Sequence, residues 1–340
     1  MALAPAAVLA LLTVITLTGG AFAHTVDKVD LQLKWVTQAQ FAGYYAARDR
    51  GFYAAERLDV SIRPGSPELV PEQVVADGRA QFGVGWVSSL LAARDRGKAL
   101  VNVAQVFAYS GMREVAFKSS GIKGPVDLKG RRVAVWFAGN EYPLVALLDK
   151  VGIDRQKDVT LVHQPFDMGL LLERAVDAAA VTTYNELKQL MDAGVKPDDL
   201  TIIDFHAHGT AMLEDGIFVS ADWLARPGNK ERAVRFVRAS LKGWEFCRDR
   251  PAACVDLVLK AQPILGREHQ TWMMTEVNKL IWGPPKPPGP LGRMNPAAFR
   301  QTADIAFRYE VIKKPADPAT YTDEIWRLAQ APKRQPQHKH

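Results

Sequence analysis

Residues 81–107 read QFGVGWVSSLLAARDRGKALVNVAQVF, and this stretch decides the fold class. Its two ends, residues 81–85 and 100–107, are short apolar runs with the length of strands. Residues 87–96 have the length of a helix and are followed by Gly97, and glycine commonly follows the last turn of a helix. A strand, a helix and a second strand in this order predict a βαβ unit with parallel strands.

The same alternation extends to both sides of this unit. Before it, we expect strands at residues 29–35 and 58–63 and helices at residues 41–50 and 71–77. A second series follows, with strands expected at 131–137, 159–164, 178–182 and 201–205 and helices at 125–129, 141–151, 168–175 and 184–193. Residues 217–220 then form a strand that returns to the first series. The rest of the chain has helix-period apolar faces at residues 230–248, 252–261, 268–282 and 296–309.

This order of elements predicts an α/β protein with two lobes, mixed but mostly parallel sheets and a helical C-terminal region. A chain of 340 residues is long enough for two lobes of ordinary size. We expect lobe one to hold residues 24–118 and 210–330, lobe two to hold residues 119–209, and the polar residues 331–340 to be a disordered tail. Two crossings between the lobes form a double hinge. A ligand that bridges the lobes would therefore favour a closed state.

The N-terminus has the pattern of a secretory signal peptide over residues 1–23. Residues 6–20 are apolar or small and uncharged, and Ala21-Phe22-Ala23 supplies small residues for cleavage before His24. The first five residues contain no Lys or Arg, so an uncleaved anchor is the alternative, although the apolar run is short for one. Cleavage predicts a mature chain that is free in the periplasm of a Gram-negative cell.

Charge and composition exclude several classes of protein. The net charge of +6 comes from scattered basic residues, with no basic run interleaved with aromatics, so we expect no nucleic-acid partner. The seven histidines do not cluster with cysteines or carboxylates at ligand spacing, so we expect no metal and no cofactor.

The two cysteines, Cys247 and Cys254, leave two states open. On one straight helix they would lie roughly 10 Å apart, too far to bond. Pro251 lies between them, however, and a proline there would end one helix and start the next, so that the thiols could face each other. In an oxidising compartment a disulfide could then form.

Several stretches carry a resemblance to a known family through their order and spacing. They read LKW at 33–35, QFAGYYAA at 40–47, GFY at 51–53, LDV at 58–60, AQFGV at 80–84 and DLKGRRVAVWFAGNEY at 127–142. Together they resemble the NMT1/THI5-like (SsuA/THI5) family over residues 30–250. The resemblance implies the two-lobed fold of type II periplasmic binding proteins. It also implies a binder of thiamine pyrimidine precursors, riboflavin, or taurine- and nitrate-type ligands that serves a transporter.

The same family includes a synthase that builds the thiamine pyrimidine from pyridoxal phosphate and its own histidine. Its lysine and histidine match Gly85 and Ser89 here, and glycine forms no imine while serine carries no imidazole. Residues 208–216, which match the synthase's cysteine-rich stretch, contain no cysteine. The resemblance therefore implies a binding protein and not an enzyme, with a synthase as the alternative.

Ligands of open α/β sheets bind beyond the carboxyl ends of the strands, so we take the candidate site residues from those ends. Aromatic faces can stack on a flat ring, and amides, hydroxyls and carboxylates can bond its edge. The competing interpretations are helix packing for Phe41 and Tyr45, helix capping for Ser88, Ser89 and Asn140, and a core position for Trp136. The candidates are Trp35, Gln38, Gln40, Tyr44, Trp86, Ser88, Ser89, Phe107, Trp136, Gly139, Asn140, Glu141, Tyr142, Thr183, Tyr184, Asn185, Glu214 and Asp215.

These residue types favour a flat nitrogen heterocycle such as a hydroxymethyl- or formylaminopyrimidine, with Glu141 accepting from an exocyclic amine. Riboflavin is an alternative because its ring also stacks on Trp and Tyr. A sulfonate- or nitrate-type ligand is less favoured, because only Lys34 offers a cation near these loops. The expected role is that of a monomeric solute-binding protein that delivers its ligand to an ABC transporter permease in the inner membrane. A sensor that presents the same two lobes to a signalling partner is the other alternative.

Overall fold

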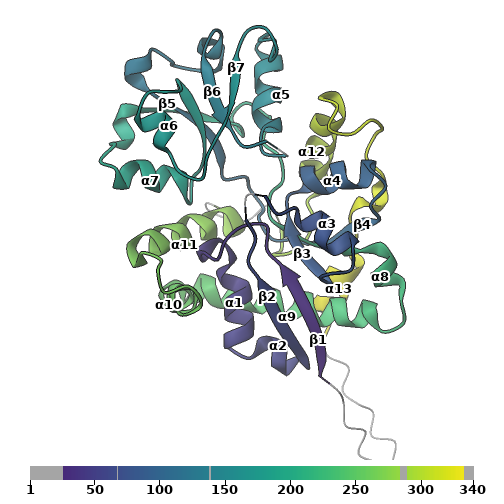
Figure 1. Cartoon of the computed structure of the whole chain (residues 1–340). Coiled ribbons are helices and arrows are strands. Elements are labelled where there is room, and N and C mark those ends of the chain that lie inside the picture. Colours follow the sequence, from purple (N-terminus) through teal and green to yellow (C-terminus); the bar gives the residue numbers. More distant parts are fainter. Residues whose placement is uncertain (1–25, 67, 138, 284–288, 333–340) are drawn as a thin grey trace, which may run out of the picture.

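The computed structural model describes residues 26–66, 68–137, 139–283 and 289–332. The expected signal peptide and residues 333–340 of the expected tail lie outside the described residues. The described chain forms two separate five-stranded sheets, each covered by helices, and Figure 1 shows one sheet above the other.

The first sheet has the strand order β2-β1-β3-β10-β4. Strand β1 (Asp27–Gln32) runs parallel to β2 (Leu58–Arg63) and to β3 (Phe82–Gly85). Strand β10 (Gly216–Ser220) lies antiparallel between β3 and β4 (Leu100–Gln105). The prediction that residues 217–220 return to the first series is therefore confirmed.

The second sheet has the order β7-β6-β8-β5-β9. Its strands are β5 (Met112–Phe117), β6 (Arg132–Val135), β7 (Thr160–His163), β8 (Ala178–Thr182) and β9 (Leu200–Asp204). Strand β6 runs parallel to β7 and β8, whereas β5 runs antiparallel to β8 and β9.

Strand β5 corrects the predicted boundary between the lobes. We expected residues 112–117 to belong to lobe one, but they lie between two strands of the second sheet, so the first crossing precedes Met112. The expectation of mixed, mostly parallel sheets is confirmed, because in each sheet of the described chain only the strand next to a crossing, β10 or β5, runs against its neighbours.

The helices of the first half of the chain alternate with these strands as expected. They are α1 (Ala42–Asp49), α2 (Phe52–Ala55), α3 (Pro71–Ala76), α4 (Val87–Asp95), α5 (Tyr142–Lys150), α6 (Gly169–Leu172) and α7 (Glu186–Asp192). The C-terminal region adds α8 (Ala221–Ala225), α9 (Asn229–Asp249), α10 (Pro251–Ala261), α11 (Arg267–Trp282), α12 (Pro296–Arg308) and α13 (Glu324–Gln330). No described helix is both long and apolar enough to cross a bilayer.

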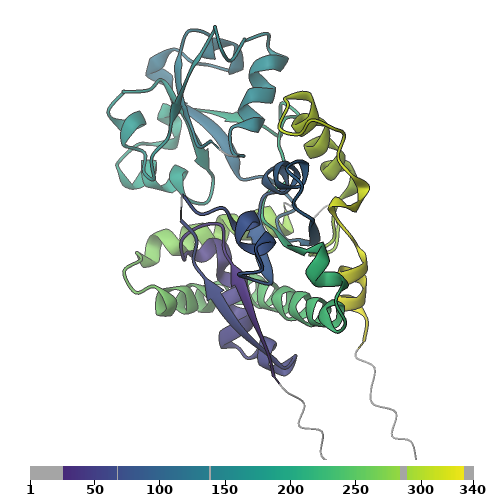
Figure 2. The ribbon, with the colours of Figure 1, turned by 45° about the vertical axis from the view of Figure 1, so that its right-hand side comes forward.

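The C-terminal helices hold the two halves of the molecule together. Helix α9 packs on α1, where Gly43 and Gly243 allow close backbone approach and Trp244 is fully buried. Helix α12 packs on α4 of the first half and α5 of the second, as the yellow-green helix beside both in Figure 2 shows. Tyr309, just after α12, donates a hydrogen bond of 2.8 Å to Asp149 at the end of α5.

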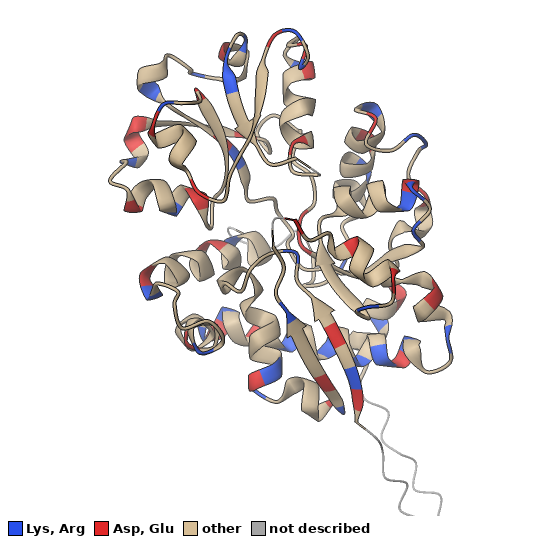
Figure 3. Cartoon of the chain, viewed as in Figure 1, with Lys and Arg blue, Asp and Glu red and all other residues tan. Residues whose placement is uncertain are grey.

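Cys247 and Cys254 form a disulfide, the state that the sequence left open. Their Cα atoms are 5.4 Å apart because α9 ends at Asp249 and α10 begins at Pro251, so the chain turns between them. Both sulfurs are buried in the core of the first half. Lys and Arg are interspersed with Asp and Glu along the described elements of both halves (Figure 3).

Candidate ligand-binding cleft

A cavity of about 450 Å³ lies between the two sheets. Its lining comes from the segments that follow β1, β2 and β3 in the first sheet and β6, β7 and β8 in the second. These are carboxyl ends of parallel strands, the places where α/β sheets bind ligands. The volume lies in the usual range for sites that hold a small molecule.

Asp215 organises the wall that belongs to the first half. This carboxylate is only 2% exposed and lies 2.9 Å from the Lys34 ammonium. It also accepts hydrogen bonds from Trp86 Nε1 at 3.1 Å and from Gln40 Nε2 at 2.8 Å. The Lys34 ammonium lies 4.0 Å above the Trp86 ring. One buried carboxylate therefore neutralises the lysine and orients an indole and an amide that line the cavity.

Glu214 supports the network from the crossing that precedes β10. It accepts hydrogen bonds from the Ser110 hydroxyl and from the Met112 backbone N–H, at the other crossing. Burial raises the pKa of Glu214 to about 6, although the nearby Lys34 charge opposes that rise. Glu214 thus joins the two crossing segments to each other and does not line the cavity.

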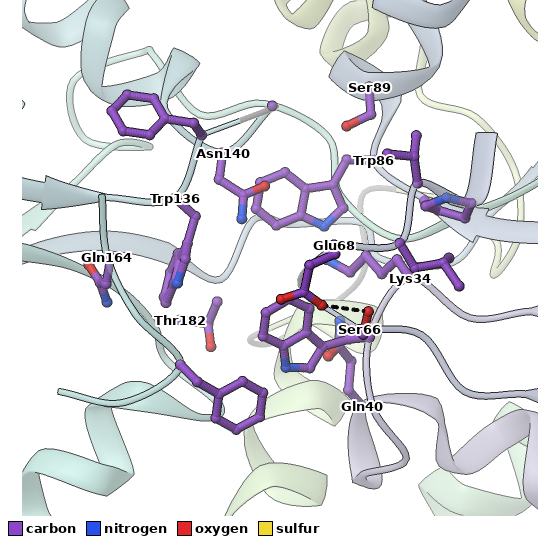
Figure 4. A pocket seen from close by; sticks show the side chains of 18 of the residues that line it. Lys34, Gln40, Ser66, Glu68, Trp86, Ser89, Trp136, Asn140, Gln164 and Thr182 are labelled. Carbon is purple, nitrogen blue, oxygen red and sulfur yellow. Dashed lines mark hydrogen bonds between the residues drawn. The ribbon is translucent and has the colours of Figure 1, made fainter. Parts of the chain in front are cut away.

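The wall of the second half centres on the turn between β6 and α5. Trp136 is fixed by a hydrogen bond of 3.1 Å from its Nε1 to the carbonyl of Pro165. Glu141 accepts a hydrogen bond of 2.8 Å from the Gly139 N–H, so this carboxylate holds the turn. Figure 4 shows Trp136 and Asn140 on one side of the cavity and Trp86 and Lys34 on the other.

The two halves approach each other closely at Gly139. The Ser88 hydroxyl donates a hydrogen bond of 3.4 Å to the Gly139 carbonyl. The φ angle of Gly139 is +133°, and a Cβ there would lie 2.6 Å from Ser89 Oγ. Glycine is therefore required both by the backbone conformation and by the space available.

A second contact between the halves is aromatic. Trp35, after β1, stacks on Phe166, after β7, with ring centroids 5.4 Å apart and planes 5° apart. This spacing is typical of direct ring contact. The pair therefore joins the two lobes beside the cavity and leaves no room for a ligand ring between them.

Most of the candidate residues line the cavity together. Those that do are Trp35, Gln38, Gln40, Trp86, Ser89, Trp136, Gly139, Asn140, Tyr142, Tyr184 and Asn185. Burial raises the pKa of Tyr142 to about 12, so its hydroxyl remains a hydrogen-bond donor at neutral pH.

The structure places the other candidates behind the lining. Tyr44 packs its ring edge-on against Trp244 at 5.6 Å, which corrects its expected role as a stacking face. Phe107 contacts the Tyr184 ring at 6.1 Å and is fully buried. Ser88, Glu141, Thr183, Glu214 and Asp215 also lie outside the lining and act through backbone or network hydrogen bonds.

Sequence reasoning missed two lining segments, residues 66 and 68–72 after β2 and residues 163–166 at the end of β7 and after it. Both follow strands that the sequence predicted, so the carboxyl-end rule could have found them. Arg96 also lines the cavity, so Lys34 is not the only cation at the site. Within the described ranges, no three His, Cys, Asp or Glu side chains converge to hold a metal ion.

Residues 38–254, more than half of the chain, match the family described as NMT1/THI5 like. The riboflavin-binding protein RibY of Chloroflexus aurantiacus is 28% identical over 70% of this chain and 68% of its own. A formylaminopyrimidine-binding protein of Halalkalibacterium halodurans is 23% identical over 86% of this chain and 88% of its own. A 4-amino-5-hydroxymethyl-2-methylpyrimidine phosphate synthase of Legionella pneumophila is 23% identical over 70% of this chain and 75% of its own.

Among solved structures, the periplasmic aliphatic sulphonate binding protein SsuA of Escherichia coli has a similar fold. Its TM-score is 0.65 at 15% identity, over 85% of this chain and 90% of that chain. This similarity confirms the expected fold class, that of two-lobed periplasmic binding proteins.

Proposed function

The chain belongs to the NMT1/THI5-like family, and on that premise we propose that it is the solute-binding component of an ABC import system. Its ligand is a small, flat nitrogen heterocycle, and a thiamine pyrimidine precursor such as a hydroxymethyl- or formylaminopyrimidine fits best. One observation carries the proposal. Tryptophan rings and side-chain amides from both sheets line the same cavity, so a ligand held there touches both halves.

The polar groups of the cavity support a neutral or weakly basic ligand over a sulfonate or nitrate. An anion site is expected to present a desolvated cation that has no other counterion. Here the Lys34 ammonium is already paired with the Asp215 carboxylate at 2.9 Å, and Arg96 is exposed. Amide groups at Gln38, Gln40 and Asn140 instead supply both donors and acceptors for the edge of a heterocycle.

Two residues of the same wall support the proposal of a binding role over catalysis. Gly85 holds the position of the synthase lysine, and a Cβ there would lie 2.7 Å from Glu72 Oε1. A lysine would not fit at this position unless the glutamate moved. Ser89 replaces the histidine that the synthase consumes. The proposed role is that of a periplasmic binder that delivers its ligand to an inner-membrane permease.

A ligand panel tests this function directly. The panel holds 4-amino-5-hydroxymethyl-2-methylpyrimidine, its formylaminopyrimidine relative, riboflavin, an alkanesulfonate and nitrate, each added to the purified protein. At one hundred times its dissociation constant, a ligand stabilises the folded state by about 2.7 kcal/mol, which raises the Tm by a few degrees. We expect a pyrimidine to give the largest shift. A response to the sulfonate or nitrate alone would contradict the proposed ligand class.

Two variants test whether the ligand binds in the cavity. Trp35→Ala removes a lining ring that also joins the halves, and we expect the affinity for the pyrimidine to fall by about 10-fold or more. Phe307→Ala is the matched control, because Phe307 is an exposed aromatic residue on α12 outside the cavity. Equal affinities of the two variants in calorimetric titration would show that the ligand binds elsewhere.

A further inference from the structure

Among the described residues, three glutamates line the cavity, namely Glu68, Glu72 and Glu186. Glu72 differs from the other two in its hydrogen bonding. Glu68 is exposed and accepts a hydrogen bond of 3.0 Å from Ser66. Both oxygens of Glu186 are occupied by short-range bonds, one of them from Asn185 at 2.6 Å. Glu72 is 3% exposed, and its Oε1 has no hydrogen-bond partner among the described residues.

The surroundings of Glu72 show why this carboxyl is unusual. A Cβ at Gly85 would lie 2.7 Å from its Oε1, so this oxygen lies beside the Gly85 backbone, and both residues line the cavity. A buried carboxyl oxygen with no donor is costly to the fold. A ligand that donates a hydrogen bond to this oxygen would remove that cost.

Burial and the charges around Glu72 together bring the pKa of its carboxyl close to neutral pH. Burial raises its pKa to about 7, while a hydrogen bond from its own backbone and the charges of Lys34, after β1, and of Arg96, at the end of α4, oppose that rise. Two acidic groups belong to neighbouring segments. They are Glu68, just before α3, and Asp215, which precedes β10 and is paired with Lys34. Near pH 7, Glu72 is therefore present in both protonation states.

Resting on the proposed function, we propose that Glu72 selects ligands that carry an amidine edge, meaning an exocyclic amine beside a ring nitrogen, as in 4-aminopyrimidines. One carboxyl oxygen accepts the amine N–H, and the other shares a single proton with the ring nitrogen. The Glu72 carboxyl and the ring nitrogen together hold one proton in the complex, whichever of the two groups carries it. Above the pKa of both partners, binding therefore takes up one proton from solution.

The test measures the affinity of 4-amino-5-hydroxymethyl-2-methylpyrimidine by calorimetry between pH 5.5 and 8.5. In the unmodified protein we expect Kd to rise above pH 7, approaching tenfold per pH unit as free Glu72 loses its proton. Buffers with different ionisation enthalpies should report uptake of about one proton at pH 8.

Three variants separate recognition from structure. E72Q keeps the shape of the protonated acid and can bond the same edge, so it should bind with a Kd that no longer changes above pH 7. E72L should lower the affinity for the pyrimidine by about 10- to 100-fold, because buried donors of the ligand are left unpaired. E173L is the matched control, because Glu173 is an exposed glutamate that does not line the cavity, and it should change Kd less than about threefold.

The outcomes separate this inference from the proposed function. A pyrimidine that binds equally well to E72L, or that keeps its pH dependence in E72Q, overturns the role of Glu72 and leaves the proposed function standing. Binding of riboflavin or of the sulfonate in place of any pyrimidine overturns both, as does the absence of binding across the whole panel. Loss of affinity in E72L together with a flat pH profile in E72Q supports the assignment.

Discussion

The ion pair between Lys34 and Asp215 is the contact on which the first wall of the cavity depends. Its atoms are 2.9 Å apart and its side chains are 16% and 2% exposed. At an effective dielectric constant of 20, two unit charges at this distance attract by about 6 kcal/mol before desolvation. Desolvation of both ions offsets most of that attraction. We therefore expect a net coupling energy of about 2 kcal/mol between the two side chains.

A double-mutant cycle measures this coupling. Asp215→Asn leaves the Lys34 ammonium beside Trp86 without its counterion, and we expect it to lower the free energy of unfolding by about 3 kcal/mol. Lys34→Met leaves a buried carboxylate with only the Trp86 and Gln40 hydrogen bonds, and we expect a similar loss. The double variant removes both charges and should lose about 2 kcal/mol less than the sum. Urea unfolding at pH 7, with the m-value compared across variants, provides the free energies.

The exposed pair of Asp30 and Arg63 is the control for this cycle. Its atoms are 2.8 Å apart, but its side chains are 26% and 46% exposed. The same cycle with Asp30→Asn and Arg63→Met should therefore give a coupling below about 1 kcal/mol that weakens in 1 M salt. The reasoning is refuted if the coupling of Lys34 with Asp215 is no larger than that of the exposed pair.

Two further predictions concern a buried acid and a glycine. Glu114 on β5 is fully buried with no hydrogen-bond partner for either oxygen among the described residues, and burial raises its pKa well above the usual 4.5. The folded state thus holds a proton that the unfolded state releases above pH 4.5, so stability falls as pH rises from there. We expect E114Q to raise the free energy of unfolding by about 1–3 kcal/mol at pH 8 and by little at pH 4. Equal Tm values of E114Q and the unmodified protein at pH 8, in a series of thermal melts, would contradict this. Gly139→Ala should weaken ligand binding by calorimetry because its Cβ would meet Ser89, whereas Gly152→Ala, also at positive φ but with nothing within 4 Å, should leave affinity unchanged.

The strand ends show how far the site could be predicted from the sequence. Strands β1, β3, β6 and β8 carry apolar runs with glycine or polar residues after them, and that local pattern was enough to find Trp35, Trp86, Trp136 and Tyr184. The rule failed for Tyr44 because a helix that follows a strand end has an inner face, and Tyr44 lies on it against Trp244. Periodicity over eight residues does not indicate which side of α1 faces the cavity and which faces α9.

The amino-acid sequence by itself determined most of the elements, the α/β class and the return of the chain to its first half, because strands, helices and glycine stops depend on local periodicity and backbone preference. Only the tertiary structure decided that β5 belongs to the second sheet, that Asp215 binds Lys34, and that Glu72 lies buried against Gly85. Each of these depends on contacts between residues far apart in the chain. Their energies come from burial and pairing that a linear pattern does not contain.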